Sequence, residues 1–347
     1  MKIHTIGILL AAAGLLVVGV YALSAATAPQ HNPEPAATVP TVPPSSDSEV
    51  VTKANDKTTG KSGKTITDNM GREVTIPENP ERILALQASI MESLLCIGII
   101  PVGKVDEYKI REEGIALPSV GSHTSVNIES VYKLQPDVII GNTRYQSSIL
   151  ESLEATGAAV IIVDPESIGE VPLVDNVEYW GEVFDRTENA QEYTGHIRKT
   201  ADKLKQKIAN ETDIKRVVII QDGDTILAAQ KTTSYGSILT LLGLENIVPG
   251  DLPGSKDACL VPYDVETIIR EDPDMIFVIA SSSDPEQNKA IIQKYKKDPK
   301  WQGLTAVKNN KIITLPFKVK MGRASTEEML NTTASTILAA CSQNKNP

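Results

Sequence analysis

The feature that most constrains the fold is a short pattern that occurs twice, at residues 128–140 and 265–277. In each copy a glutamate, Glu129 or Glu266, lies seven positions before the proline of a Pro-Asp pair, and a run of apolar residues follows. This order of residues predicts a short helix, a proline stop and a buried strand. Two such units indicate that the chain contains two copies of one α/β architecture.

The stretch between the two copies has the pattern of one long amphipathic helix, from about Glu188 to Asn210. At about 1.5 Å per residue, such a helix spans roughly 35 Å, which is the width of a small domain. We interpret it as a rigid connection between two lobes; the alternative is an ordinary surface helix within one domain. Its apolar residues recur every three or four positions and are Ala190, Tyr193, Ile197, Ala201, Leu204 and Ile208.

Apolar runs and helical patterns alternate through the rest of the chain, which implies parallel sheets covered on both faces. A length of 347 residues suits two domains once the chain ends are discounted. The expected fold class is therefore α/β, with two Rossmann-like lobes that have parallel central sheets and are joined by one long α-helix. The predicted strands are 73–77, 82–86, 99–105, 137–140, 159–164, 216–221, 225–230, 275–280 and 311–315.

The first residues predict export from the cytoplasm. An uncharged apolar run from Ile6 to about Leu23 follows Lys2, so residues 1–28 are expected to be a signal peptide or a membrane anchor. Residues 29–64 are rich in Pro, Thr and Ser, and this composition predicts a disordered tether. The folded body is thus expected at the cell surface or in the periplasm. The domains are 29–64 for the tether, 65–186 for the N-terminal lobe, 187–211 for the linking helix and 212–342 for the C-terminal lobe.

Charge and cysteine content narrow the function. A net charge of −10 argues against nucleic acid as a partner. Three cysteines lie far apart without a CxxC spacing, which argues against a thiol metal site and leaves at least one thiol free or intermolecular. No G-x-S-x-G elbow is present, and no G-x-G-x-x-G follows a predicted strand. We therefore predict no catalytic residues.

The ligand site is expected in a cleft between the lobes, because open parallel sheets bind ligands beyond the carboxyl ends of their strands. The side chains that follow the predicted strands are small, polar or aromatic, as suits a polar ligand. Arg144, Tyr145, Tyr235 and Arg323 rank first, since guanidinium groups and aromatic rings dominate recognition. The predicted ligand-binding residues are Gln87, Ser89, His123, Arg144, Tyr145, Lys231, Tyr235, Ser281, Met321 and Arg323.

Two features of these residues bear on the kind of ligand. His123 could ligate iron or haem, although a solvated loop histidine is the commoner case. Further possible haem-iron partners are Tyr145, Tyr235, Tyr263 and Met321. An anionic ligand is indicated by the cations Arg144, Lys231, Lys318, Lys320 and Arg323. No His, Cys or carboxylate cluster has the spacing of a metal site, so the sequence does not identify residues that would bind a metal ion directly.

Two stretches of this chain resemble a known protein family. Residues 68–77 (Asp-Asn-Met-Gly-Arg-Glu-Val-Thr-Ile-Pro) with 80–83, and residues 127–129 with 134–140, are similar to signatures of extracellular substrate-binding proteins. These proteins serve ATP-driven importers of iron-siderophores, haem and cobalamin. The resemblance covers about Thr65 to Cys341. It implies two lobes linked by one long helix, little hinge motion, and docking to a permease through one exposed glutamate per lobe, which here are Glu129 and Glu266.

The expected function is therefore a non-catalytic receptor that captures a metal-bearing small molecule and delivers it to an ABC importer permease. The protein is expected to hold no cofactor of its own, and the transported ligand contains iron or cobalt. One alternative is an enzyme of related two-lobed architecture, such as a metal chelatase or a nitrogenase-like subunit, which needs a histidine or cysteine cluster in the cleft. Another is a surface scaffold protein, which needs no concave polar pocket.

Overall fold

The computed structural model describes residues 63–250, 252–254, 258–280, 282–319 and 322–342. The predicted signal peptide or anchor at 1–28, and nearly all of the predicted tether, lie outside this range. Gly63 and Lys64, which were assigned to the tether, instead begin strand β1 (Gly63–Thr67), which pairs antiparallel with β2 (Glu73–Pro77). The composition of β1 is as polar as that of the tether, so only its pairing with β2 marks it as folded.

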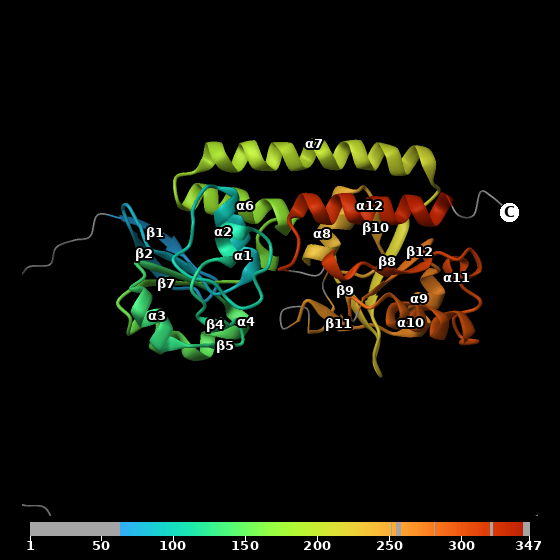
Figure 1. Ribbon diagram of the computed structural model, residues 1–347, viewed down its shortest axis with the longest axis horizontal. Coiled ribbons are helices and arrows are strands. Elements are labelled where there is room, and N and C mark those ends of the chain that lie inside the picture. Colours follow the sequence, from blue (N-terminus) through green and yellow to red (C-terminus); the bar gives the residue numbers. More distant parts are fainter. Residues whose placement is uncertain (1–62, 251, 255–257, 281, 320–321, 343–347) are drawn as a thin grey trace, which may run out of the picture. The chain divides into compact units, whose positions relative to one another are not determined.

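The N-terminal lobe is built on three parallel strands in the order β3-β6-β7 (Figure 1). Their residues are almost all buried, as expected for a parallel sheet that is covered on both faces. The strands are β3 (Ile83–Ala85), β6 (Val138–Asn142) and β7 (Ala159–Val163). The helices are α1 (Ala88–Cys96), α2 (Glu112–Ile115), α3 (Ile128–Leu134), α4 (Thr143–Gln146), α5 (Leu150–Glu154) and α6 (Pro172–Val183).

The strand predicted at residues 99–105 is wrong. This segment is irregular and makes one isolated β-bridge, between Lys104 and Ser119. Pro101 has no backbone N–H to donate to a ladder, and only the Val102 N–H reaches β3, at 2.9 Å from the Ile83 carbonyl oxygen. The apolar residues in this stretch therefore fill the edge of the core without extending the sheet.

The C-terminal lobe has three central parallel strands, β8-β12-β13, and antiparallel strands at one edge. The edge strands correct the expectation of a wholly parallel sheet: β9 turns back after a loop too short for the crossover that parallel strands need, and β11 follows it. The strands are β8 (Arg216–Gln221), β9 (Leu227–Ala229), β10 (Glu245–Asn246), β11 (Leu260–Pro262), β12 (Met275–Ile279) and β13 (Ile312–Leu315).

Helices cover both faces of this sheet, as predicted. Along β8, Val217 and Ile219 point into one core, whereas Val218 and Ile220 point into the other. Helices α7, α8 and α12 contribute to the first core, and α9, α10 and α11 to the second. The bounds are α8 (Ser234–Leu241), α9 (Val265–Glu271), α10 (Pro285–Lys297), α11 (Thr305–Lys308) and α12 (Thr326–Ser342).

The long helix predicted from the apolar stripe is α7 (Thr187–Glu211), which runs along both lobes in Figure 1. Ala190 is buried in the core of the N-terminal lobe, while Ile197, Ala201 and Ile208 are buried in that of the C-terminal lobe. Helices α6 and α12 pack against it. One continuous helix thus contributes side chains to two hydrophobic cores.

The repeated sequence forms the same structure in both lobes. Helices α3 and α9 each end at a residue in the left-handed conformation, Gln135 (φ 44°) and Asp272 (φ 40°). The strands that follow, β6 and β12, are the middle strands of β3-β6-β7 and β8-β12-β13. The predicted helix, proline stop and buried strand are therefore confirmed in both copies.

The aspartate of each Pro-Asp pair ties its strand to the neighbouring one. Asp137 Oδ2 accepts hydrogen bonds from the backbone N–H groups of Glu81 (2.9 Å) and Arg82 (3.0 Å), just before β3. In the same way, Asp274 Oδ2 accepts from Lys215 and Arg216 at the start of β8, both at 2.8 Å. Each aspartate thereby fixes the register of two parallel strands that are far apart in the sequence, β3 and β6 in one lobe and β8 and β12 in the other.

Replacement of Asp137 by alanine is expected to lower the free energy of unfolding by about 2 kcal/mol, because two backbone donors lose a charged acceptor. Urea denaturation measures this change. Asp137→Asn keeps one acceptor oxygen and is expected to lose less. Asp213→Ala, at an exposed position between α7 and β8, is the control. An unfolding midpoint for Asp137→Ala equal to that of the control would contradict this role.

Candidate functional site

A cavity of about 270 Å³ lies between the lobes, beyond the carboxyl ends of the central strands. Gln87 follows β3 and Tyr145 follows β6 from the N-terminal side, while Gln221 and Ile279 end β8 and β12 on the C-terminal side. This is the place that the strand ends predict for a ligand. The other lining residues are Ala88, Ser89, Glu107, His123, Tyr235, Cys259, Leu260 and Gly322.

Of the ten predicted ligand-binding residues, five line this cavity, three lie outside its lining, and two are not among the described residues. The structure brings together Gln87, Ser89, His123, Tyr145 and Tyr235. Lys231 and Arg323 are exposed outside the lining, where the Arg323 guanidinium stacks 4.8 Å from the centre of the Phe317 ring. Arg144 is buried in a network described below, and Ser281 and Met321 lie outside the described residues.

His123 is held in the cavity wall by two contacts with Glu107. It lies at the tip of the two-residue turn between β4 (Gly121–Ser122) and β5 (Ser125–Val126). Its Nδ1 is 3.0 Å from Glu107 Oε1, and its backbone N–H donates to the other oxygen of Glu107 at 3.1 Å. A carboxylate only accepts, so Nδ1 carries a hydrogen, and in the neutral form of the ring the Nε2 lone pair is open to another partner.

The turn that carries His123 is also held by a buried side chain of the N-terminal lobe. Gln146, which is fully buried, donates from Nε2 to the His123 carbonyl oxygen at 2.6 Å and accepts from the Asn142 backbone N–H at 2.8 Å. Asn142 in turn donates to Gln87 Oε1 at 2.7 Å. The ring of Tyr145 meets His123 edge-on, with centroids 4.7 Å apart. The end of β6 therefore positions three lining side chains.

Tyr145 is expected to act as a phenol and not as a phenolate. Burial raises its pKa, and the nearby Cys259 and Glu166 raise it further against the opposing effect of Arg144. A raised pKa keeps the hydroxyl protonated at neutral pH, so Tyr145 can donate a hydrogen bond to an oxygen of a ligand. Tyr263, by contrast, lies in the core of the C-terminal lobe and donates to the Ile247 carbonyl oxygen at 3.2 Å, away from the cavity lining.

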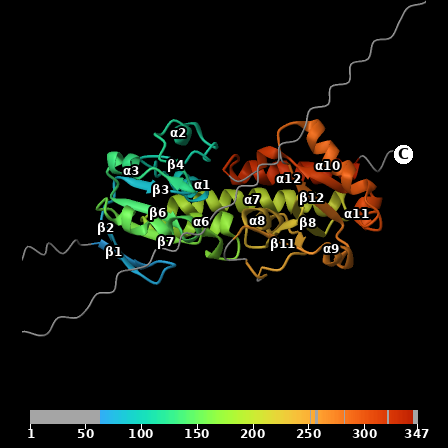
Figure 2. The ribbon, with the colours of Figure 1, turned by 90° about the horizontal axis from the view of Figure 1, so that it is seen from below.

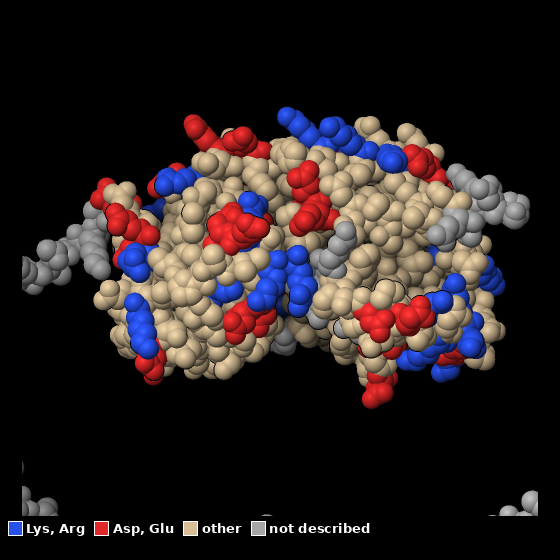
Figure 3. Space-filling view, viewed as in Figure 1, with Lys and Arg blue, Asp and Glu red and all other residues tan. Residues whose placement is uncertain are grey.

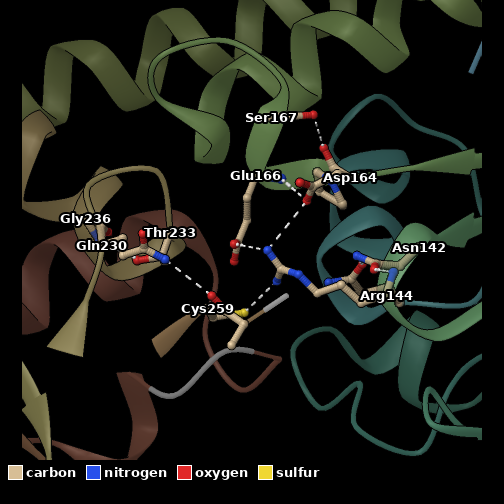
Figure 4. A network of polar contacts seen from close by, with 12 residues as sticks. Asn142, Arg144, Asp164, Glu166, Ser167, Gln230, Thr233, Gly236 and Cys259 are labelled. Atoms are coloured by element: carbon tan, nitrogen blue, oxygen red, sulfur yellow. Dashed lines mark hydrogen bonds and ion pairs between the residues drawn. The ribbon is translucent and has the colours of Figure 1, made fainter. Parts of the chain in front are cut away.

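Arg144 connects the two lobes beside the cavity (Figure 4). Its Nη2 is 2.7 Å from Glu166 Oε2 and 3.8 Å from Asp164 Oδ1, and its Nη1 donates to Cys259 Sγ at 3.2 Å. Only 6% of the side chain is exposed. The predicted role of Arg144 in ligand contact is therefore not supported by its position, because its charge is already balanced by carboxylates.

The thiol of Cys259 is a neutral partner in this network. Burial raises its pKa to about 12, with a further contribution from Glu166, so it stays protonated at neutral pH. A second link between the lobes is the Lys109 backbone N–H, which donates to the Gly322 carbonyl oxygen at 2.8 Å. In the space-filling view, Lys and Arg side chains gather at this junction of the lobes (Figure 3).

Seven lining residues were not among the predicted ones: Ala88, Glu107, Gln221, Cys259, Leu260, Ile279 and Gly322. Gln221 ends a predicted strand, and that position alone was a signal. Glu107 follows the segment wrongly predicted as a strand, so nothing in the sequence placed it beside His123. Cys259 and Leu260 depend on β11 lying beside β9, which is a tertiary feature.

Within the described part of the chain, no three His, Cys, Asp or Glu side chains converge as a metal site. The lining residues that the structure describes include no lysine or arginine either. Of the cations expected to meet an anionic ligand, Arg144, Lys231 and Arg323 thus lie off this wall, whereas the Lys318 side chain and Lys320 are outside the described set. The prediction of an anionic ligand remains untested.

The sequence matches known proteins over most of its folded part. It is 23% identical over 262 residues to the Fe(3+)-citrate-binding protein YfmC of Bacillus subtilis, covering 74% of this chain and 79% of that protein. The probable siderophore-binding lipoprotein YfiY of the same organism is 27% identical over 268 residues, covering 74% and 81%. The high-affinity heme uptake system protein IsdE of Staphylococcus aureus is 23% identical over 245 residues, covering 69% and 81%.

The fold is also that of solved structures. Staphylococcus aureus SirA complexed with staphyloferrin B superposes with a TM-score of 0.59 at 18% identity, covering 82% of this chain and 98% of SirA. At this identity the likeness establishes the fold alone. The family model described as periplasmic binding protein matches residues 83–319, which include both parallel sheets and α7. The chain therefore belongs to the periplasmic binding protein family.

Proposed function

We propose that this protein is an extracytoplasmic solute-binding receptor that captures an iron-siderophore, haem or corrinoid-type metal complex between its lobes and delivers it to an ABC importer permease. The observation that carries the proposal is the cavity at the carboxyl ends of the parallel strands of both lobes, in a chain of the periplasmic binding protein family. The names of YfmC, YfiY and IsdE point to iron complexes as the ligand class.

The chemistry of the cavity wall suits such a ligand. Gln87, Ser89, Gln221 and the two tyrosines offer hydrogen bonds and aromatic surface to the organic part of a complex. His123 offers Nε2, oriented by Glu107, to a metal with an open coordination position. The ligand therefore brings the metal, and the protein supplies shape, hydrogen bonds and one imidazole.

The volume of the cavity indicates which of these ligands fits best. Its volume of about 270 Å³ lies just below the range of about 300–1,000 Å³ usual for drug-sized ligands. A compact ferric complex of a carboxylate or small siderophore fits this volume better than a porphyrin or a corrin, which would require lining side chains to move. We place a compact ferric complex first, haem second and a corrinoid third.

An enzyme built on the same architecture is the second candidate, and it has less support. A chelatase needs protein ligands that hold the metal during the reaction. In the described residues His123 faces one carboxylate, Glu107, and no group of three potential metal ligands is present. The family assignment likewise favours a receptor.

Export and docking complete the proposal. The apolar run within residues 1–28 would direct the chain out of the cytoplasm as a signal peptide or an anchor. No helix in the described ranges has the length and apolar character needed to cross a membrane. Glu129 on α3 and Glu266 on α9, both exposed, would pair with cations on the permease.

Ligand binding is expected to stabilise the fold. At a ligand concentration of about 100 times the dissociation constant, the stabilisation is about 2.7 kcal/mol, which corresponds to a rise of about 5 °C in Tm for a protein of this size. Differential scanning fluorimetry with ferric citrate, ferric hydroxamates, ferric catecholates, haem and cobalamin measures it. The iron-free compounds are the controls. No rise with any of these complexes would overturn the proposal.

His123→Ala is expected to weaken binding of the metal complex by about 10–100-fold, because an oriented imidazole ligand is lost. Glu107→Gln is expected to weaken it less, since Nδ1 can still donate to the amide oxygen. Isothermal titration calorimetry gives the affinities, and the absorption spectrum of the bound complex shows whether the ligand field changes. The control is His196→Ala, which removes an exposed side chain of α7 beside Glu327. Equal affinity for His123→Ala and His196→Ala would exclude metal contact by His123.

A further inference from the structure

Two exposed apolar side chains occupy equivalent positions in the repeated unit. Among the described residues, five large hydrophobic side chains are exposed, and two of them are Tyr132 (46%) on α3 and Ile269 (39%) on α9. Each lies three residues after the glutamate of its repeat, Glu129 or Glu266. Residues three apart on a helix are surface neighbours, so each helix presents one carboxylate beside one apolar group.

The two helices lie on one side of the folded unit. In Figure 1, α3 and α9 are on the side away from α7, one on each lobe. Figure 2, which views the protein from that side, shows them diagonally across from each other. The two exposed acid-apolar pairs, Glu129 with Tyr132 and Glu266 with Ile269, are therefore carried by helices on one side of the folded unit, one pair on each lobe.

We propose that Tyr132 and Ile269 are the apolar anchors of the docking surface, and that the partner offers two equivalent sites, each an apolar pocket bordered by an arginine or a lysine. This inference rests on the proposed function, in which the partner is the two halves of the importer permease. A duplicated surface suits a partner with two equivalent subunits, because both contacts form at once in one orientation. Carboxylates on this side require cations opposite them.

Apolar anchors would supply the binding affinity that exposed glutamates do not provide. An exposed ion pair contributes little to affinity, because water and salt screen it. A tyrosine or isoleucine that enters a pocket loses its contact with water and can dominate an interface of modest size. The carboxylates would then set orientation and Tyr132 and Ile269 would set affinity.

The two pairs differ in one respect. Glu129 is held by Lys133, with Oε1 2.8 Å from Nζ, whereas the described contacts include no ion pair of Glu266. Arg270, at the position that corresponds to Lys133, pairs with Glu271 at 3.7 Å instead. Docking of the N-terminal lobe must therefore exchange Lys133 for a cation of the partner, while docking of the C-terminal lobe needs no such exchange.

The test measures binding of the full chain to the importer permease of its source organism, with its ATPase subunits, reconstituted in lipid nanodiscs. Tyr132→Ser and Ile269→Ser are each expected to weaken the Kd about tenfold, and the double variant about a hundredfold. Tyr132→Phe is expected to retain wild-type affinity. Ile115→Ser is the matched control, because Ile115 has the same 39% exposure on α2. Lys133→Met is expected to tighten binding about threefold and Arg270→Met to leave it unchanged.

Ligand binding separates this inference from the proposed function. All the variants should keep the wild-type rise in Tm with the ferric complex, which also shows that they fold. If Tyr132→Ser and Ile269→Ser bind the permease as tightly as Ile115→Ser, the apolar anchors are excluded even though the receptor function stands. If the wild type binds the permease but no metal complex, the proposed ligand class is wrong, whereas the role of Tyr132 and Ile269 in docking is still supported. Self-association of the chain that Tyr132→Ser abolishes, without permease binding, would overturn the choice of partner.

Discussion

The burial of one helix in two cores is the constraint on which this structure depends. Helix α7 places Ala190 in the N-terminal core and Ile197 in the C-terminal core, and Tyr193 between them packs against both. A fully buried isoleucine such as Ile197 contributes about 1.5–3 kcal/mol, and bending the helix between the lobes would expose apolar surface on both sides. The contacts of Arg144 with Cys259 and of Lys109 with Gly322 add polar links across the same junction. The cleft is therefore a preformed feature, not one that a ligand must create.

The lobes bring suitable side chains to this cleft because each is organised around its copy of the Pro-Asp unit. Asp137 and Asp274 align the first two central strands of each lobe, and the carboxyl ends of those strands then fall at the same edge. Gln87, Tyr145, Gln221 and Ile279 follow from that arrangement. The same units place α3 and α9 on the outer surface, so one repeated element determines both the inner wall and the proposed docking surface.

Features that depend on local sequence patterns were predicted, whereas features that depend on contacts between distant segments were not. The α7 helix, the repeated unit and the strand ends rest on local periodicity and on the rule for ligands of parallel sheets, and these were identified. The pairing of β1 with β2, the irregular segment at 99–105 and the antiparallel β9 depend on partners or on backbone donors that periodicity does not show. The pairing of Arg144 with Glu166 was likewise not predicted, because Arg144 lies on α4 and Glu166 in a 3-10 helix after β7, and only the fold brings them together.

The proposed function requires that a metal complex occupies the cavity between the lobes. The most direct measurement is anomalous diffraction on both sides of the iron absorption edge, from crystals grown with the ferric complex that stabilises the protein most. One strong iron peak is expected within the cavity, near His123 and between Tyr145 and Tyr235. An iron peak outside the two lobes, or saturated crystals with no ordered iron in the cavity, would contradict it.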